Sequence, residues 1–260
     1  MKLTLTLISF LTFSVAFSQK PNLHKLWVGD ANNYLRVDTD AVRVQKSWDY
    51  EGKKYVTTRA YRYALIGDTL RIPKPEFYDS INHDFIIETL STDELKLTSL
   101  NPNSRILAFA EIPKRVLTFR EQHKVYTDTI TFQKILFSST TCYGICPAMT
   151  FQIDNKKQMK FIGDTYAVKQ GFYTAVLPDK LYNELQKALA ISELDKLENH
   201  GVFNIDAPTY RLEVHYNGKV KFIKSSFLPY VTYELLNMLL QVPKQVELQQ
   251  AEPMQISFTQ

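Results

Sequence analysis

The chain lacks the residue patterns that mark most catalytic and cofactor-binding proteins. Its 8 glycines form no phosphate-binding loop, and no serine lies in a G-x-S-x-G turn. The 5 histidines show no H-E-x-x-H spacing and no close pair. They are His24, His83, His123, His200 and His215. The sequence therefore predicts no catalytic residue, no metal site and no cofactor.

The chain also has no large excess of positive or negative charge. The formal net charge is +4, and the longest basic runs are pairs. Such a balance does not indicate nucleic acid or an anionic membrane as a partner. After residue 18, the best candidate for a membrane-spanning stretch is Leu235–Leu240, which is far short of the ~20 residues that such a helix needs.

The first residues resemble an export signal. Met1 and Lys2 precede an apolar run that ends at Phe17, and small residues surround a cut after Ser18. Removing residues 1–18 removes one charge, Lys2, so the net charge changes from +4 to +3. We expect a mature chain that is exported to the periplasm or secreted, with no membrane span.

Residues 24–122 read as short strands separated by turns. The chain has 16 Phe and 15 Tyr but 2 Trp, which favours a strand-rich fold. Alternating apolar residues and turn signals predict an antiparallel meander or a small barrel-like sheet. The expected strands include 61–65, 69–72, 85–90, 95–100 and 115–120.

Residues 125–242 predict an α+β domain of β-hairpins packed with two helices. One hairpin turns at 155–158, and a second turns at Asn217-Gly218, a dipeptide typical of tight hairpins. A helix is expected to start at Pro178-Asp179, and another to cover 230–240. The tail, residues 243–260, alternates Met254, Ile256 and Phe258, and either adds an edge strand or stays loose.

Cys142 and Cys146 are the only cysteines and the best candidates for a site. Three intervening residues let the sulfurs meet in a tight turn, for which Gly144 would supply conformational freedom. A structural disulfide, a free pair, and a redox-active or metal-binding pair all stay open. The redox interpretation is weakened because Pro147 leads into a strand, whereas thiol oxidoreductases place their cysteines at a helix start.

Other polar residues are assigned no chemistry. His215 falls on the polar face of a strand and is expected to face solvent. Two acidic pairs, Asp38 with Asp40 and Asp195 with Glu198, are interpreted as solvated surface carboxylates. The alternating aromatic residues are interpreted as core rather than as a ligand pocket.

The segment around the cysteines resembles an uncharacterised family of exported bacterial domains with a C-[FY]-G-x-C-P motif. The resemblance depends on the stretch Ser138–Asp154, which includes Tyr143, on the single residue Gly163, and on the stretch Asp206–Thr209. They extend over about residues 130–240. The resemblance implies export and domain limits rather than an activity.

The first segment resembles small lipocalin-like domains through Trp27 and the stretches 63–70 and 90–97. Lys25 stands where the G-x-W motif has glycine, so this is a hint about the fold rather than about a cavity.

Three hypotheses about function follow from the sequence. The leading one is an exported, non-enzymatic binding or accessory protein of the cell envelope, whose partner is a protein or a small ligand. The second is a thiol-dependent redox or enzymatic accessory that uses Cys142 and Cys146. The third is a carrier of a small apolar ligand in the N-terminal domain.

Overall fold

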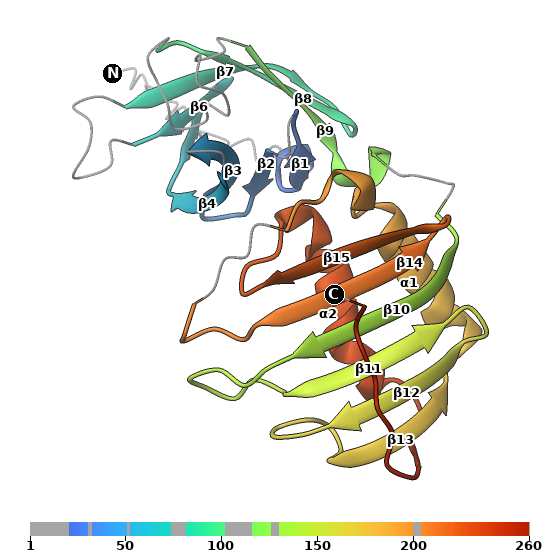
Figure 1. The fold of residues 1–260 in the computed structure, drawn as a ribbon. Helices are drawn as coiled ribbons and strands as arrows, with labels where there is room; N and C mark the ends of the chain where they lie inside the picture. Colours follow the sequence, from blue (N-terminus) through green and yellow to red (C-terminus); the bar gives the residue numbers. More distant parts are fainter. Residues whose placement is uncertain are drawn as a thin grey trace, which may run out of the picture.

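In the residues that it describes, the structure, a computed structural model, contains two antiparallel sheets and two helices (Figure 1). It describes residues 21–30, 33–50, 53–73, 82–101, 116–125, 130–199 and 204–259. The predicted export signal and His200 lie outside these residues. The predicted β-rich α+β fold is confirmed.

The first sheet has nine strands in the order β4-β3-β2-β1-β9-β8-β7-β6-β5. Its strands are β1 (Leu26–Val28), β2 (Tyr34–Val37), β3 (Val42–Tyr50), β4 (Lys53–Tyr61), β5 (Ala64–Ile66), β6 (Thr69–Ile72), β7 (His83–Leu90), β8 (Glu94–Ser99) and β9 (Val116–Glu121). A short 3₁₀ turn, η1 (Pro21–Leu23), precedes them, and another, η2 (Gln122–Lys124), follows them.

This sheet curls into a half-barrel (Figure 1). The sheet is the barrel-like alternative of the prediction: two meanders, β1 to β4 and β5 to β9, are joined because β1 pairs with β9. The expected strand 61–65 is wrong as one element, because the chain breaks at Arg62 and Tyr63 between β4 and β5. These two residues connect opposite edges of the sheet, so the edges come within roughly 11 Å there. A half-barrel core, with Trp27, Phe85 and Phe119 among its largest side chains, fills the concave side.

The second sheet has seven strands in the order β15-β14-β10-β11-β12-β13-β16. Its strands are β10 (Phe132–Ser139), β11 (Met149–Asp154), β12 (Gln158–Gly163), β13 (Gly171–Val176), β14 (Tyr210–Tyr216), β15 (Lys219–Ser225) and β16 (Gln249–Gln250). Both predicted hairpins are confirmed, β11 with β12 and β14 with β15. At the second turn, Asn217 and Gly218 both adopt positive φ, as the dipeptide predicts.

Two helices cover one face of the second sheet. They are α1 (Asp179–Ala190) and α2 (Tyr233–Gln241), with 3₁₀ turns η3 (Leu194–Lys196), η4 (Tyr230–Thr232) and η5 (Val242–Lys244) beside them. Asp179 lies in the first turn of α1, where a carboxylate is favourable next to the helix dipole. Both predicted helices are present, although the second begins with the 3₁₀ turn η4.

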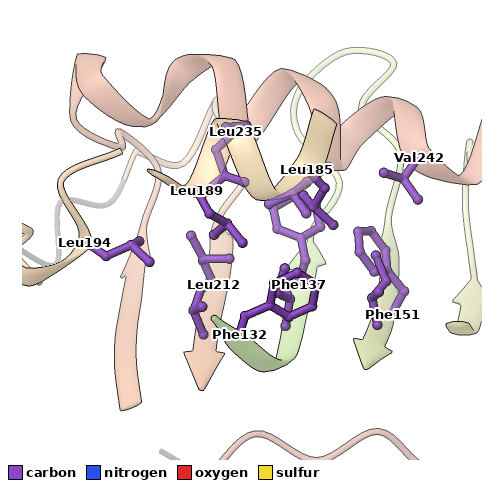
Figure 2. Close-up of a cluster of buried hydrophobic side chains, with 14 of the residues drawn as sticks. Phe132, Phe137, Phe151, Leu185, Leu189, Leu194, Leu212, Leu235 and Val242 are labelled. Atoms are coloured by element: carbon purple, nitrogen blue, oxygen red, sulfur yellow. The ribbon is translucent and has the colours of Figure 1, made fainter. Parts of the chain in front are cut away.

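The core of the second sheet lies between the helices and the strands. Figure 2 shows Leu185 and Leu189 of α1 and Leu235 of α2 pointing at Phe137 and other strand residues. All of these side chains are buried. The aromatic residues predicted to form core rather than a pocket therefore do so here.

The two sheets are packed against each other through β1, β2 and the short helical turns. Val28 and Tyr34 of the first sheet belong to the core of the second. The buried Gln122 side chain donates a hydrogen bond to the carbonyl of Val231 at 2.9 Å. The side-chain oxygen of Gln45 accepts one from the backbone N–H of Tyr230 at 2.6 Å.

Candidate functional site

Four loops lie at one end of the second sheet. Because the strands are antiparallel, the C-terminal ends of β10, β12 and β15 lie beside the N-terminal ends of β11, β13 and β14. The loops at these ends follow the left side of the lower sheet in Figure 1. We call them together the loop end, consisting of residues 140–148, 164–170, 204–209 and 226–229.

Cys142 and Cys146 form a disulfide within the first loop. Their Cα atoms are 5.5 Å apart, and the S–S distance is 1.95 Å. The base of the loop is fixed because the Ser139 hydroxyl donates a hydrogen bond to the carbonyl of Pro147. The sequence left open whether these cysteines are free or bonded, and in the structure they are bonded to each other.

Gly144 does not play the predicted role in this turn. Its φ is not positive, and a Cβ there would meet only Cys142 Sγ, at 3.9 Å. The conformational freedom expected of Gly144 is therefore not used for a positive φ in this turn. Instead, the backbone N–H of Gly144 donates to Cys142 Sγ at 3.2 Å, which helps to fix the loop.

The disulfide loop is bound on one side to the loop before β14. The backbone N–H of Tyr143 donates to the carbonyl of Asp206 at 3.4 Å. Thr140 and Thr209 are joined twice: the N–H of Thr140 donates to the Thr209 carbonyl at 3.1 Å, and the N–H of Thr209 donates to Thr140 Oγ1 at 2.9 Å. These bonds hold the two loops in one orientation.

The loop between β12 and β13 lies on the other side. Ala148 and Thr165 are joined by a backbone hydrogen bond of 2.9 Å, and so are Asp164 and Ala148. Gly163 is required for this packing, because a Cβ there would lie 1.8 Å from the backbone oxygen of Lys169. The loop end is therefore one hydrogen-bonded unit.

Large apolar side chains project from this unit into solvent. Tyr143 is 91% exposed, Ile145 is 84% exposed and Ile205 is 96% exposed. Tyr166, Val168 and Phe227 of the neighbouring loops are also exposed. Burying such residues would remove apolar surface from water, so their exposure on ordered loops is typical of an interaction surface.

The residues that carried the sequence resemblance converge here. Cys142–Pro147, Gly163 and Asp206–Thr209 are far apart in the sequence but meet at the loop end. Ile205 and Tyr166 were not predicted as site residues. Ile205 directly precedes one of the quoted stretches, which is the only sequence signal that pointed to it.

One member of each acidic pair forms ion pairs: Asp38 with Arg36 and Arg43, and Asp195 with Lys219. Burial of Asp38 would raise the pKa of its carboxyl, but hydrogen bonds from Arg43 and Arg36 outweigh this and lower the pKa. The pKa of Asp195 is lowered by hydrogen bonds from Lys219 and from the Tyr216 hydroxyl. Their arrangement fits ion pairing rather than acid–base chemistry.

Hollows among the described residues lie away from the loop end. A groove of about 410 Å³ between α1 and α2 is mostly apolar and includes His123, Ala188 and Met238. A polar cleft of about 540 Å³ between the sheets includes Asp30, Glu193, Asp195, Lys196, Glu198 and Lys221. Among the described residues, no group of three or more His, Cys, Asp or Glu side chains is arranged to hold a metal ion.

The fold and the loop end describe an α+β domain in which a half-covered antiparallel sheet presents a disulfide-closed loop. Residues 133–245 match the model of a protein family, the domain of unknown function DUF6438. No curated protein and no solved structure shows significant similarity to the chain. None of the helices in the described part of the chain has the length and apolar character required to cross a bilayer.

Proposed function

We propose that this protein is an exported, non-enzymatic binding protein whose loop end contacts a partner protein at the cell envelope or outside the cell. The observation that carries the proposal is the set of exposed apolar side chains, Tyr143, Ile145 and Ile205. They lie on two loops that backbone hydrogen bonds join, and a disulfide closes the first of these loops.

A protein partner fits this surface better than a small ligand does. The three side chains project outward and are almost fully exposed, so they do not line a hollow. Small-ligand sites are concave and bury most of the ligand. Exposed tyrosine and aliphatic residues instead resemble the anchors that insert into pockets of a partner protein.

The disulfide supports binding by fixing the loop before the partner arrives. Ordering a flexible loop on binding costs free energy, and a covalent cross-link reduces that cost. Because the loop is also held at its base and on both sides, Tyr143 and Ile145 are presented in a defined arrangement. We include export in the proposal, since disulfides persist in oxidising compartments. We also propose that the export signal is cut after Ser18 and that the mature chain has two domains, residues 24–122 and 125–242.

The test is a comparative pull-down from envelope extract with the full mature chain. Tyr143→Ser combined with Ile145→Ser should reduce recovery of the partner at least tenfold, because the central apolar anchors are lost. The matched control is Val176→Ser, on β13 of the same sheet at its opposite end, where the side chain is 59% exposed.

Recovery that depends on Tyr143 and Ile145 but not on Val176 supports the proposal. Equal recovery with both variants, after circular dichroism shows both to be folded, contradicts it. Intact mass of the exported chain, measured without reductant after alkylation, checks the rest of the proposal: a mass matching Gln19–Gln260, two hydrogens short and without an adduct, is expected.

A further inference from the structure

The C-terminal segment crosses the face of the second sheet that the helices leave uncovered. We call Ala251–Thr259 the strap. In Figure 1 it runs from β13 across β12, β11 and β10 toward β14, in front of the sheet. The tail was expected either to add an edge strand or to stay loose. Gln249–Gln250 form the edge strand β16, and the strap then continues over the sheet without forming a strand.

Both ends of the strap are attached to the sheet. At one end, the N–H of Ala251 donates to the carbonyl of Phe172 at 2.9 Å. At the other, the N–H of Thr259 donates to Glu213 Oε2 at 2.8 Å, and the ring of Phe258 lies edge-on to that of Phe222 at 6.4 Å. These contacts fix the course of the strap across the strands.

The sheet face under the strap contains buried residues. Leu136 and Glu213 are fully buried. They are not part of the core under the helices, which contains the adjacent residues Ile135 and Val214 instead. Side chains alternate along a strand, so Leu136 and Glu213 point to the opposite face. They belong to one row directly across the sheet: Phe222, Glu213, Leu136, Gln152, Lys160 and Thr174.

The strap shows what kind of segment this face accepts. Met254, Ile256 and Phe258 are partly buried, whereas Gln255 and Ser257 between them are exposed. This is the alternation of an extended segment that lays every second side chain on a surface. Phe258 contacts Phe222 on this face, and Glu213 accepts a hydrogen bond from the backbone N–H of Thr259.

The attachment is sparse. Within the described part of the strap, only Ala251 and Thr259 donate backbone hydrogen bonds to the sheet. A segment that crosses the face of a sheet does not join the backbone ladder, so side-chain contacts with the face must hold the rest of the strap. The match to the family ends at residue 245, so it includes the sheet face but not the strap.

We propose that this face is a docking surface for an extended segment of a partner protein with apolar side chains at alternate positions, and that the strap occupies it as an intramolecular competitor. The surface lies on a different part of the domain from the loop end, so this inference does not rest on the proposed function. Displacement of the strap would exchange one set of contacts for an equivalent set.

The probe is a fluorescein-labelled peptide with the sequence of residues 251–260, which stands in for a partner segment of this chemistry. Its binding is measured by fluorescence anisotropy to the full mature chain and to the full chain carrying Ile256→Ser and Phe258→Ser, which weakens the strap. The peptide should bind the variant at least tenfold more tightly than the unaltered chain, because the competitor is weakened. The matched control is Gln255→Ser with Ser257→Ala, two exposed strap positions that should leave affinity for the peptide unchanged.

Two outcomes overturn the proposal. One is a folded Ile256→Ser/Phe258→Ser chain that does not bind the peptide. The other is equal binding of a second peptide in which Met254, Ile256 and Phe258 are all serine, since the face would then not select apolar side chains. Glu213→Gln, added to the strap variant, should weaken binding about fivefold, and an unchanged affinity would remove Glu213 from the surface.

Discussion

At the scale of single residues, backbone geometry and buried charge decide which positions tolerate change. Gly163 and Gly144 belong to the same loop end but differ in the space around them. Glu213 is a fully buried carboxylate on a face that the sequence pattern marks as polar. His215 lies on that face as predicted, but its side chain is only 21% exposed because the face is not open to solvent.

Gly163→Ala should lower the free energy of unfolding by about 3 kcal/mol or more, because the new Cβ would overlap the Lys169 carbonyl oxygen and force the backbone apart. Gly144→Ala is the matched control and should change it by less than about 0.5 kcal/mol, since the space there is open. Urea denaturation measures both values. Similar losses at the two sites would contradict the packing described for the loop end.

Glu213 should make the stability of the strap depend on pH. Burial would raise the pKa of Glu213, but hydrogen bonds from His215 and from the N–H of Thr259 outweigh burial and lower the pKa. A carboxyl with a lowered pKa stabilises the fold above its unfolded pKa, near 4.3, and this contribution is lost as the pH falls through the folded pKa. Lys134 lies opposite His215 on the neighbouring strand β10.

Glu213→Gln should therefore lower the free energy of unfolding at pH 7 by roughly 1 to 3 kcal/mol, the contribution of hydrogen bonds to a charged group. The difference from the unaltered chain should shrink below about pH 4. Urea denaturation at pH 7, 5, 4 and 3 measures it. A difference that stays constant with pH would mean that Glu213 is not ionised in the folded protein.

At the scale of elements, the disulfide loop is supported more by its neighbours than by its own ring. Only four positions separate Cys142 from Cys146, so the bond removes little conformational entropy from the unfolded chain. Backbone bonds to residues 165, 206 and 209 hold the loop in place as well. The bond is therefore expected to affect binding more than stability.

Cys142→Ser combined with Cys146→Ser should lower the free energy of unfolding by at most about 2 kcal/mol, the value that the loop-entropy relation gives for so small a ring. Partner recovery should fall more steeply, because Tyr143 and Ile145 lose their fixed arrangement. Thermal denaturation and the comparative pull-down measure the two effects. A large loss of stability with full recovery of the partner would mean that the disulfide serves stability rather than binding.

At the scale of the whole molecule, the two sheets share a buried boundary. Tyr34 of β2 lies in the core of the second sheet, and Gln45 and Gln122 make hydrogen bonds across the boundary. Buried polar groups that lose a partner are costly. The half-barrel and the second sheet should therefore unfold together.

Calorimetry should show one cooperative transition for the full mature chain. Gln45→Ala combined with Gln122→Ala leaves the Tyr230 N–H and the Val231 carbonyl without these partners, and should cost roughly 1 to 3 kcal/mol for each residue. The single transition should broaden or split in this variant. Two separate transitions in the unaltered chain would show that the boundary does not couple the sheets.

Much of the local structure was predictable from the sequence. The alternation in residues 149–161 and 210–222, the Asn217-Gly218 turn and the apolar spacing of 181–189 depend on neighbours within a few positions, so they specify hairpins and a helix directly. The break at Arg62 and Tyr63 was missed because alternation continues through it. The sequence also singled out Cys142 and Cys146, because they are the only cysteines, but it left open whether they pair.

Which strands pair, and which loops meet, depends on the tertiary structure. Pairing of β1 with β9 and the curl of the first sheet depend on contacts between distant residues, which no local pattern encodes. The same holds for the loop end, where Tyr143, Ile145 and Ile205 come together only because β10 and β14 pair. Local patterns in the sequence thus specify most of the elements and point to the loop with the two cysteines. Long-range strand pairing creates the surface, because side chains far apart in the chain become neighbours only when the sheet forms.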